Sequence, residues 1–370
     1  MSHRSASDSG CKSMRVHALV GTIVLLGCAM TAYSQAKQTP SQNGVEANVP
    51  GSSIVRLDPA LDSVIAPDAK IERVATGFKF IEGPMWRQGR LWFSDLVGNK
   101  LYAVSPAGKL EMLKDHSGGL DSFPPGAYMG SNAMATDKDH SVLLIEQGAR
   151  KIVRLDKDLK ASLFLEKFEG KHLNSPNDLV YKSDGSLYFT DPPYGLRTQH
   201  DDDPEKKLKV NGVYRLGHAL DHKVGAAPDH SELKLLVSDL TRPNGLAFSP
   251  DEKYLYVDNS EPKKIWMRYR VLPDGTLTDA KLLYDATADP RPGAPDGMKI
   301  DALGNIYSAG PGGVWIFTPE GKPIATILMP EKVANLAWAG PDRKMLYITA
   351  SSSVYRVHLK IAGAPLIRGQ

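Results

Sequence analysis

APDGMKIDALGNIYSAGPGGVWIF, residues 294–317, contains the pattern that decides the fold. A carboxylate, Asp296, stands between Pro295 and Gly297, and an alternating segment, a turn containing Gly304 and a short apolar strand follow it. Alternation of apolar and polar residues on both sides of a glycine-containing turn predicts two antiparallel strands. The same order of features recurs along the chain, so the stretch predicts one unit of a repeat.

Six such units occupy the chain from about residue 70 to 360, at intervals of roughly 40 to 70 residues, which is about the size of a four-stranded propeller blade. Each unit begins with a side chain that carries oxygen, which we call its anchor. The anchors are Glu82, Asn132, Asn177, Asn244, Asp296 and Asn335. The sequence therefore predicts an all-β fold, a six-bladed β-propeller.

The segment KIERVATGF, residues 70–78, bears on how the ring closes. It alternates like a strand but precedes the first anchor, while the last unit lacks a final strand. We expect this N-terminal strand to complete the last blade, because that pairing removes two exposed sheet edges.

The first 53 residues differ in composition from the rest. A basic start, an apolar run over 18–32 and a small-residue site at 32–34 predict a signal peptide over residues 1–34, with Met1 or Met14 as the start. A membrane anchor is less favoured, because about 20 apolar residues are needed to cross a bilayer. The polar residues 35–53 predict a disordered linker, and 54–370 a single propeller domain.

Both cysteines fall within the predicted signal peptide, so the exported protein, periplasmic or secreted, would contain no disulfide. The segment LLGC leaves a second possibility open, a lipoprotein attached through Cys28. The formal net charge of +3 gives no single-sign field that would indicate nucleic acid. We expect no transmembrane span after cleavage, and a monomer or weak oligomer.

The anchors predict a metal site. The first strand of each propeller blade lines the central channel, so the six side chains should face one axis. Two carboxylates and four amides, without Cys or His, suit a hard divalent cation. For any single anchor, a preference of Asn or Asp for turns is the alternative explanation. Tyr194, in the segment DPPYG, either lines the channel mouth or packs within its turn.

Four segments in order, IEGPMW, SPNDLVYKSDGSLYFTDPPYG, RPNGLAFSPDEKYLYV and PDGMKIDALGNIY, resemble the senescence-marker-protein/gluconolactonase/luciferin-regenerating-enzyme family, its bacterial gluconolactonase branch in particular. The resemblance covers about residues 70–360. It implies a six-bladed propeller with one divalent cation in the channel, most often Ca²⁺, with Zn²⁺, Mn²⁺ or Mg²⁺ as alternatives.

By the same resemblance, Glu82, Asn244 and Asp296 are metal ligands, and Asn177 contacts metal or substrate. The implied activity is hydrolysis of a sugar lactone, with Asp296 as ligand and general base, and with Asn132, Gln147 and Tyr194 also at the substrate. Gln147 stands where many bacterial relatives have histidine, which leaves the substrate open. An exported sugar-binding propeller without catalysis, or a metal-dependent hydrolase of other esters or phosphotriesters, are the alternatives.

Overall fold

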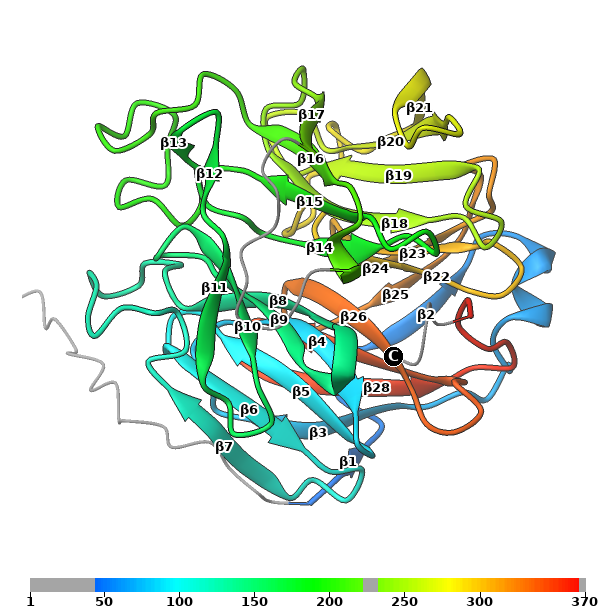
Figure 1. Cartoon of the computed structure of the whole chain (residues 1–370). Helices are drawn as coiled ribbons and strands as arrows, with labels where there is room; N and C mark the ends of the chain where they lie inside the picture. Colours follow the sequence, from blue (N-terminus) through cyan, green and yellow to red (C-terminus); the bar gives the residue numbers. More distant parts are fainter. Residues whose placement is uncertain (1–43, 222–231, 366–370) are drawn as a thin grey trace, which may run out of the picture. The chain divides into compact units, whose positions relative to one another are not determined.

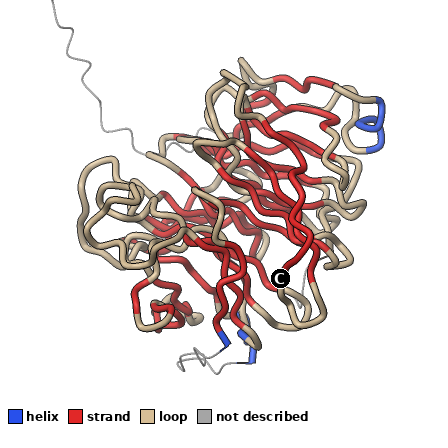
Figure 2. The backbone as a smooth tube through the Cα atoms, turned by 90° about the horizontal axis from the view of Figure 1, so that it is seen from above, coloured by secondary structure: helices blue, strands red, loops and turns tan. Residues whose placement is uncertain are grey.

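The structure is a computed structural model that describes residues 44–221 and 232–365. Six antiparallel sheets make up almost all of it, and helix is limited to short turns (Figures 1 and 2). One edge strand of each of these sheets lies innermost, and the six inner strands contact one another in a closed circle. The circle closes where β26 (Val333–Ala339) contacts β4 (Ile81–Arg87). The predicted six-bladed β-propeller is confirmed.

In five blades the four main strands follow one another along the chain. The last blade has three such strands and takes its fourth from the N-terminal side of the chain. The strands are, by blade, β4 (Ile81–Arg87), β5 (Arg90–Asp95), β6 (Lys100–Val104) and β7 (Leu110–Asp115); β8 (Ser131–Thr136), β9 (Val142–Glu146), β10 (Lys151–Leu155) and β11 (Ala161–Leu165); β14 (Leu179–Tyr181), β15 (Leu187–Asp191), β16 (Gly212–Leu216) and β17 (Leu233–Val237); β18 (Pro243–Phe248), β19 (Tyr254–Asn259), β20 (Ile265–Val271) and β21 (Leu277–Asp285); β22 (Met298–Ile300), β23 (Ile306–Gly310), β24 (Gly313–Phe317) and β25 (Pro323–Leu328); and β26 (Val333–Ala339), β27 (Met345–Ala350) and β28 (Ser353–His358).

Within residues 44–221 and 232–365, a small hairpin and three complete 3₁₀ turns lie outside the blades. They are β12 (Lys167–Phe168) with β13 (Lys171–His172), and η1 (Pro59–Ser63), η2 (Lys138–His140) and η3 (Ala219–Asp221).

The last blade is completed from the N-terminal side of the chain, as predicted. Strand β3 (Ile71–Thr76) pairs antiparallel with β28, from Ile71 opposite Val357 to Thr76 opposite Ser353. The ring is therefore closed by hydrogen bonds between the two ends of the propeller sequence, in blue and red in Figure 1.

The segment before β3 differs from the predicted disordered linker. Strand β1 (Glu46–Ala47) pairs with β3, and β2 (Ser53–Arg56) adds a fifth strand to the blade of β22–β25. Val49, between them, is buried. Strands at the outer edge of a blade bury few side chains, so a mostly polar sequence can form them. Residues 1–43 lie outside the described residues, and signal cleavage and export therefore stay predictions.

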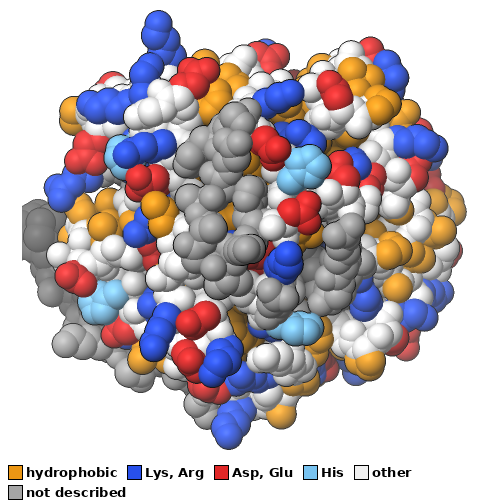
Figure 3. Space-filling view, viewed as in Figure 1, with side chains coloured by type: hydrophobic (Ala, Val, Ile, Leu, Met, Phe, Trp, Pro, Cys, Tyr) orange, Lys and Arg blue, Asp and Glu red, His pale blue; other side chains and the backbone are white. Residues whose placement is uncertain are grey.

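The core lies between neighbouring blades. Apolar side chains from facing sheets form the clusters, and the largest also takes in Leu61 and Val64 from the segment around η1. No helix in the described part of the chain is long and apolar enough to cross a membrane. On the face of Figure 3, basic and acidic side chains are interspersed, without a large patch of one sign.

The packing of Leu61 gives a stability prediction. Leu61 is fully buried, whereas Leu57, four residues earlier, is about half exposed (50%). Leu61→Ala should lower the free energy of unfolding by about 2–5 kcal/mol, because it leaves a cavity in the largest cluster. Leu57→Ala is the matched control and should cost well under half as much in urea titrations. Equal losses in the two variants would show that the η1 segment is not part of the core.

Candidate functional site

Five of the six anchors line one pocket at one end of the channel, with a volume of about 340 Å³. Glu82 comes from β4, Asn132 from β8 and Asn244 from β18. Asn177 and Asp296 stand two residues before β14 and β22. Gln147 and Tyr194 line the same pocket, so the structure brings together all seven side chains that the sequence singles out for the site.

The sixth anchor, Asn335, is a correction. In four blades the anchor stands two residues before the first apolar residue of the regular pairing, as Asn244 stands before Leu246. In the last blade that apolar residue is Leu336, so the corresponding position holds Ala334. Asn335 lies one residue further on and faces the other end of the channel. The ring of oxygen side chains at this end therefore has five members.

A close approach between neighbouring inner strands depends on glycine at the position after an anchor. At Gly297, an added Cβ would lie 1.9 Å from the side chain of Asn335. At Gly83, it would lie 2.3 Å from the carbonyl oxygen of Asn132. Glycine at these positions thus allows the anchors to converge on the axis.

Gln147 connects two of the anchor amides. Its Oε1 accepts hydrogen bonds from Asn132 Nδ2 and, at 3.5 Å, from Asn177 Nδ2. Its Nε2 donates to the carbonyl oxygen of Tyr128 at 2.7 Å. Gln147 is fully buried and therefore fixes the direction in which both asparagines point.

Two amide oxygens at the pocket have no hydrogen-bond partner among the described residues. Asn132 directs its Nδ2 to Gln147, and Asn244 directs its Nδ2 to Ser260 Oγ at 3.0 Å. Their Oδ1 atoms are buried and unbonded. A buried carbonyl oxygen without a donor is costly, so these atoms have the character of ligands for a cation.

The carboxylates at the site repel one another. Burial raises the pKa of Glu82 to about 7, in part offset by hydrogen bonds from Gly83 N–H and Asn335. Burial, and then the negative charges of Glu82, Asp258 and Asp178, raise the pKa of Asp296 well above its ordinary range. A cation placed among these groups would favour their ionised forms.

The oxygen atoms of the five pocket anchors suit a hard cation, but only two of these side chains can carry a negative charge. Within residues 44–221 and 232–365, no three His, Cys, Asp or Glu side chains are placed to hold a metal together. Glu82 and Asp296 are the only carboxylates among the pocket anchors, and the remaining oxygens belong to amides. Amide and carboxylate oxygens are ligands that Ca²⁺ accepts.

Several lining residues were not predicted from the sequence. They are Phe80, Leu96, Tyr128, Ser260, Glu261, Lys264, Gly293, Ala294, Pro295, Lys332 and Val333. Tyr128 packs against Phe80 with its ring tilted and the ring centroids 4.8 Å apart, and it comes from the loop before β8. The segments between strands supply most of these residues, and the repeat gives no signal for them. Two Pro/Gly-rich runs mark such loops in the sequence, FPPGAYMG around Tyr128 and DPRPGAP before Asp296.

Comparisons with known proteins give consistent results. A family model described as SMP-30/Gluconolactonase/LRE-like region matches residues 80–352. A gluconolactonase of Zymomonas mobilis is 34% identical over 94% of this chain and 98% of its own length. Lactonase drp35 of Staphylococcus epidermidis is 25% identical over 71% of each chain. The solved structure of a Xanthomonas campestris gluconolactonase superposes with a TM-score of 0.72 at 30% identity, covering 85% of this chain and 97% of the other.

Proposed function

This chain belongs to the SMP-30/gluconolactonase/LRE-like family, and we propose that it hydrolyses a sugar lactone in the pocket that its five anchors line. The observation that carries the proposal is the convergence of two carboxylates and three amides on that pocket. Relatives named gluconolactonase and lactonase, which match most of the chain, support the choice of substrate class.

We assign the cation to Glu82, Asn244 and Asp296, with Asn177 as a further ligand or substrate contact. The unbonded, buried Oδ1 of Asn244 and the mutual repulsion of Glu82 and Asp296 support this assignment. When bound, a divalent cation polarises the lactone carbonyl. Oxygen ligands without sulfur or imidazole favour Ca²⁺.

The protein's own side chains supply the remaining chemistry. The Asp296 carboxylate takes a proton from a water molecule, whose oxygen attacks the carbonyl carbon of the lactone. The ring C–O bond then breaks, and the proton passes to the alkoxide that leaves. A lactone is a strained, activated ester, so no Ser or Cys nucleophile is needed. Asn132 and Asn177 donate hydrogen bonds from Nδ2 to Gln147, and this orients their Oδ1 atoms to accept hydrogen bonds from the hydroxyl groups of the substrate.

A lactone panel tests this function. Aldonolactones, simple alkyl esters and a phosphotriester are assayed by proton release, with and without chelator, and with Ca²⁺, Zn²⁺, Mn²⁺ or Mg²⁺ restored. We expect turnover of an aldonolactone that the chelator abolishes and a cation restores. Binding of lactone without turnover would instead identify a non-catalytic sugar-binding propeller, and turnover of the other esters alone would assign a different substrate class.

Gln147 gives a prediction about specificity. Gln147→Ala removes the acceptor for both asparagines, so we expect kcat/KM for the preferred lactone to fall about tenfold or more. Gln147→His places a polar ring at the same position and should retain turnover with a changed order of preference in the panel. An unchanged kcat/KM in Gln147→Ala would show that the substrate does not depend on these amides.

A further inference from the structure

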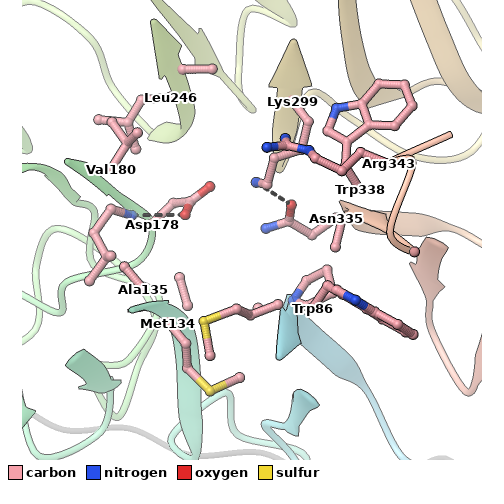
Figure 4. A pocket seen from close by; sticks show the side chains of 18 of the residues that line it. Trp86, Met134, Ala135, Asp178, Val180, Leu246, Lys299, Asn335, Trp338 and Arg343 are labelled. Atoms are coloured by element: carbon pink, nitrogen blue, oxygen red, sulfur yellow. Dashed lines mark hydrogen bonds between the residues drawn. The ribbon is translucent and has the colours of Figure 1, made fainter. Parts of the chain in front are cut away.

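A second pocket, of about 380 Å³, lies on the same six inner strands, beyond the layer of anchors; we call it the far pocket (Figure 4). On β4, Glu82 lines the candidate site and Trp86 lines the far pocket. On β8, Asn132 and then Met134 do the same. Because each inner strand runs from one pocket into the other, the two pockets open at opposite ends of the channel.

Two tryptophans held by their neighbours form walls of the far pocket. Trp86 stacks on Tyr347 with ring centroids 5.8 Å apart, and Trp338 packs edge-on against Tyr307 at 5.0 Å. A Cβ at Gly363 would lie 2.2 Å from the Trp338 ring, so this ring is also fixed from the C-terminal segment. Most of the other lining side chains are apolar. The pocket is therefore preformed, at the size of a small-molecule site.

The charges in the far pocket do not cancel. Lys299 and Asp178 face each other across it (Figure 4). Burial raises the pKa of Asp178, and the positive charge of Lys299 partly offsets this. Arg343 has no ion pair or side-chain hydrogen bond to any residue that the structure describes, and burial alone lowers its pKa. The indole Nε1 of Trp338 is buried and also lacks an acceptor among these residues. Two donors without acceptors thus remain on one side of the pocket.

We propose that the far pocket binds a small aromatic carboxylate, which is a ligand distinct from the substrate of the candidate site. The carboxylate would accept hydrogen bonds from Arg343 and Trp338 Nε1, and the ring would lie against Trp86 and Trp338. Arginine binds carboxylates through paired hydrogen bonds, so Arg343 would determine where the carboxylate of such a ligand lies. A sugar acid is a poorer match, because the apolar walls offer its hydroxyl groups few partners.

The experiment uses 2-naphthoate as the probe, titrated calorimetrically into the full chain with metal present. Three comparisons accompany it: the uncharged 2-naphthamide, gluconate, and the variants Arg343→Gln, Arg343→Lys and Lys332→Gln. Lys332→Gln removes one positive charge, as Arg343→Gln does, but Lys332 lines the candidate site at the other end of the channel. Melting temperatures confirm that each variant is folded.

We expect saturable binding of 2-naphthoate at one site, weakened about tenfold or more in Arg343→Gln, partly restored in Arg343→Lys and unchanged in Lys332→Gln. The naphthamide should bind at least about tenfold more weakly, which tests the charge without any substitution. No binding of 2-naphthoate, equal binding of the amide, preference for gluconate, or loss of binding in Lys332→Gln alone would each overturn the proposal. None of these outcomes depends on lactone turnover.

Discussion

Asp296→Asn is expected to lower kcat for lactone hydrolysis by about 10²–10⁴-fold, the usual contribution of a general base. The substitution keeps an oxygen in the same position, so the amide can still contact a cation, but it cannot take a proton from water. Asp296 is suited to this role because it lies at the pocket, where burial and then the charges of neighbouring carboxylates raise its pKa. A bound cation would lower that pKa again and leave the carboxylate ionised at neutral pH.

The measurement is steady-state hydrolysis with the metal content of each preparation determined by elemental analysis. Asp202→Asn is the matched control, because Asp202 is exposed on the loop after β15 and should leave kcat unchanged. If metal-loaded Asp296→Asn hydrolyses lactones at the wild-type rate, another group in the channel activates the water.

Glu82→Gln should have the second large effect, on the affinity for the cation. It removes one of the two anchor carboxylates, so we expect at least the roughly 10–100-fold loss of affinity that even outer-shell substitutions cause. Activity at low metal concentration should fall in proportion and recover as metal is added. Because the cation would bind only the folded channel, excess metal should raise the melting temperature of the wild type more than that of the variant. Glu111→Gln, at an exposed position, should behave as the wild type.

Without metal, Glu82→Gln should raise the melting temperature instead of lowering it. The pKa of Glu82 is raised from 4.5 to about 7, so the fold favours its protonated form. This contribution to stability is present below the unfolded-state pKa and is lost as the pH rises through about 7. Metal-free Glu82→Gln should therefore melt higher than metal-free wild type at about pH 8, with the gap closing below about pH 5. A lower melting temperature for the variant under both conditions would show that Glu82 serves packing alone.

The repeat explains why the sequence predicted the fold well. Each blade repeats an anchor, an alternating strand and a turn, and KIERVATGF has the alternation of a strand with no partner nearby in sequence. Strand β2 could not be predicted in this way, because Ser53–Arg56 is a four-residue edge strand with no fully buried side chain. Its partner, β25, is known only from the folded ring.

The candidate site was predictable to the extent that the repeat places one residue per blade on the axis. Asn335 shows the limit: β8 and β18 hold their anchors inside a bulge, whereas the bulge of β26 holds Ala334. Asn335 stands one residue later, and one residue of offset moves a side chain from one pocket to the other. Lys299 and Arg343 carry no sequence pattern that distinguishes them from surface cations. Their position at the far pocket follows only from the closed ring.

The pairing of β3 with β28 sets an order of events during folding. Residues 71–76 are made early and must wait for residues 353–357, near the end of the chain, before the ring can close. Contacts of such large sequence separation are slow to form, because the intervening chain must first be brought together. Five blades can collapse as the chain emerges, but the sheet edges of the sixth stay open until the last strands are synthesised. A polypeptide released before β28 would thus expose unpaired strands and be prone to aggregate.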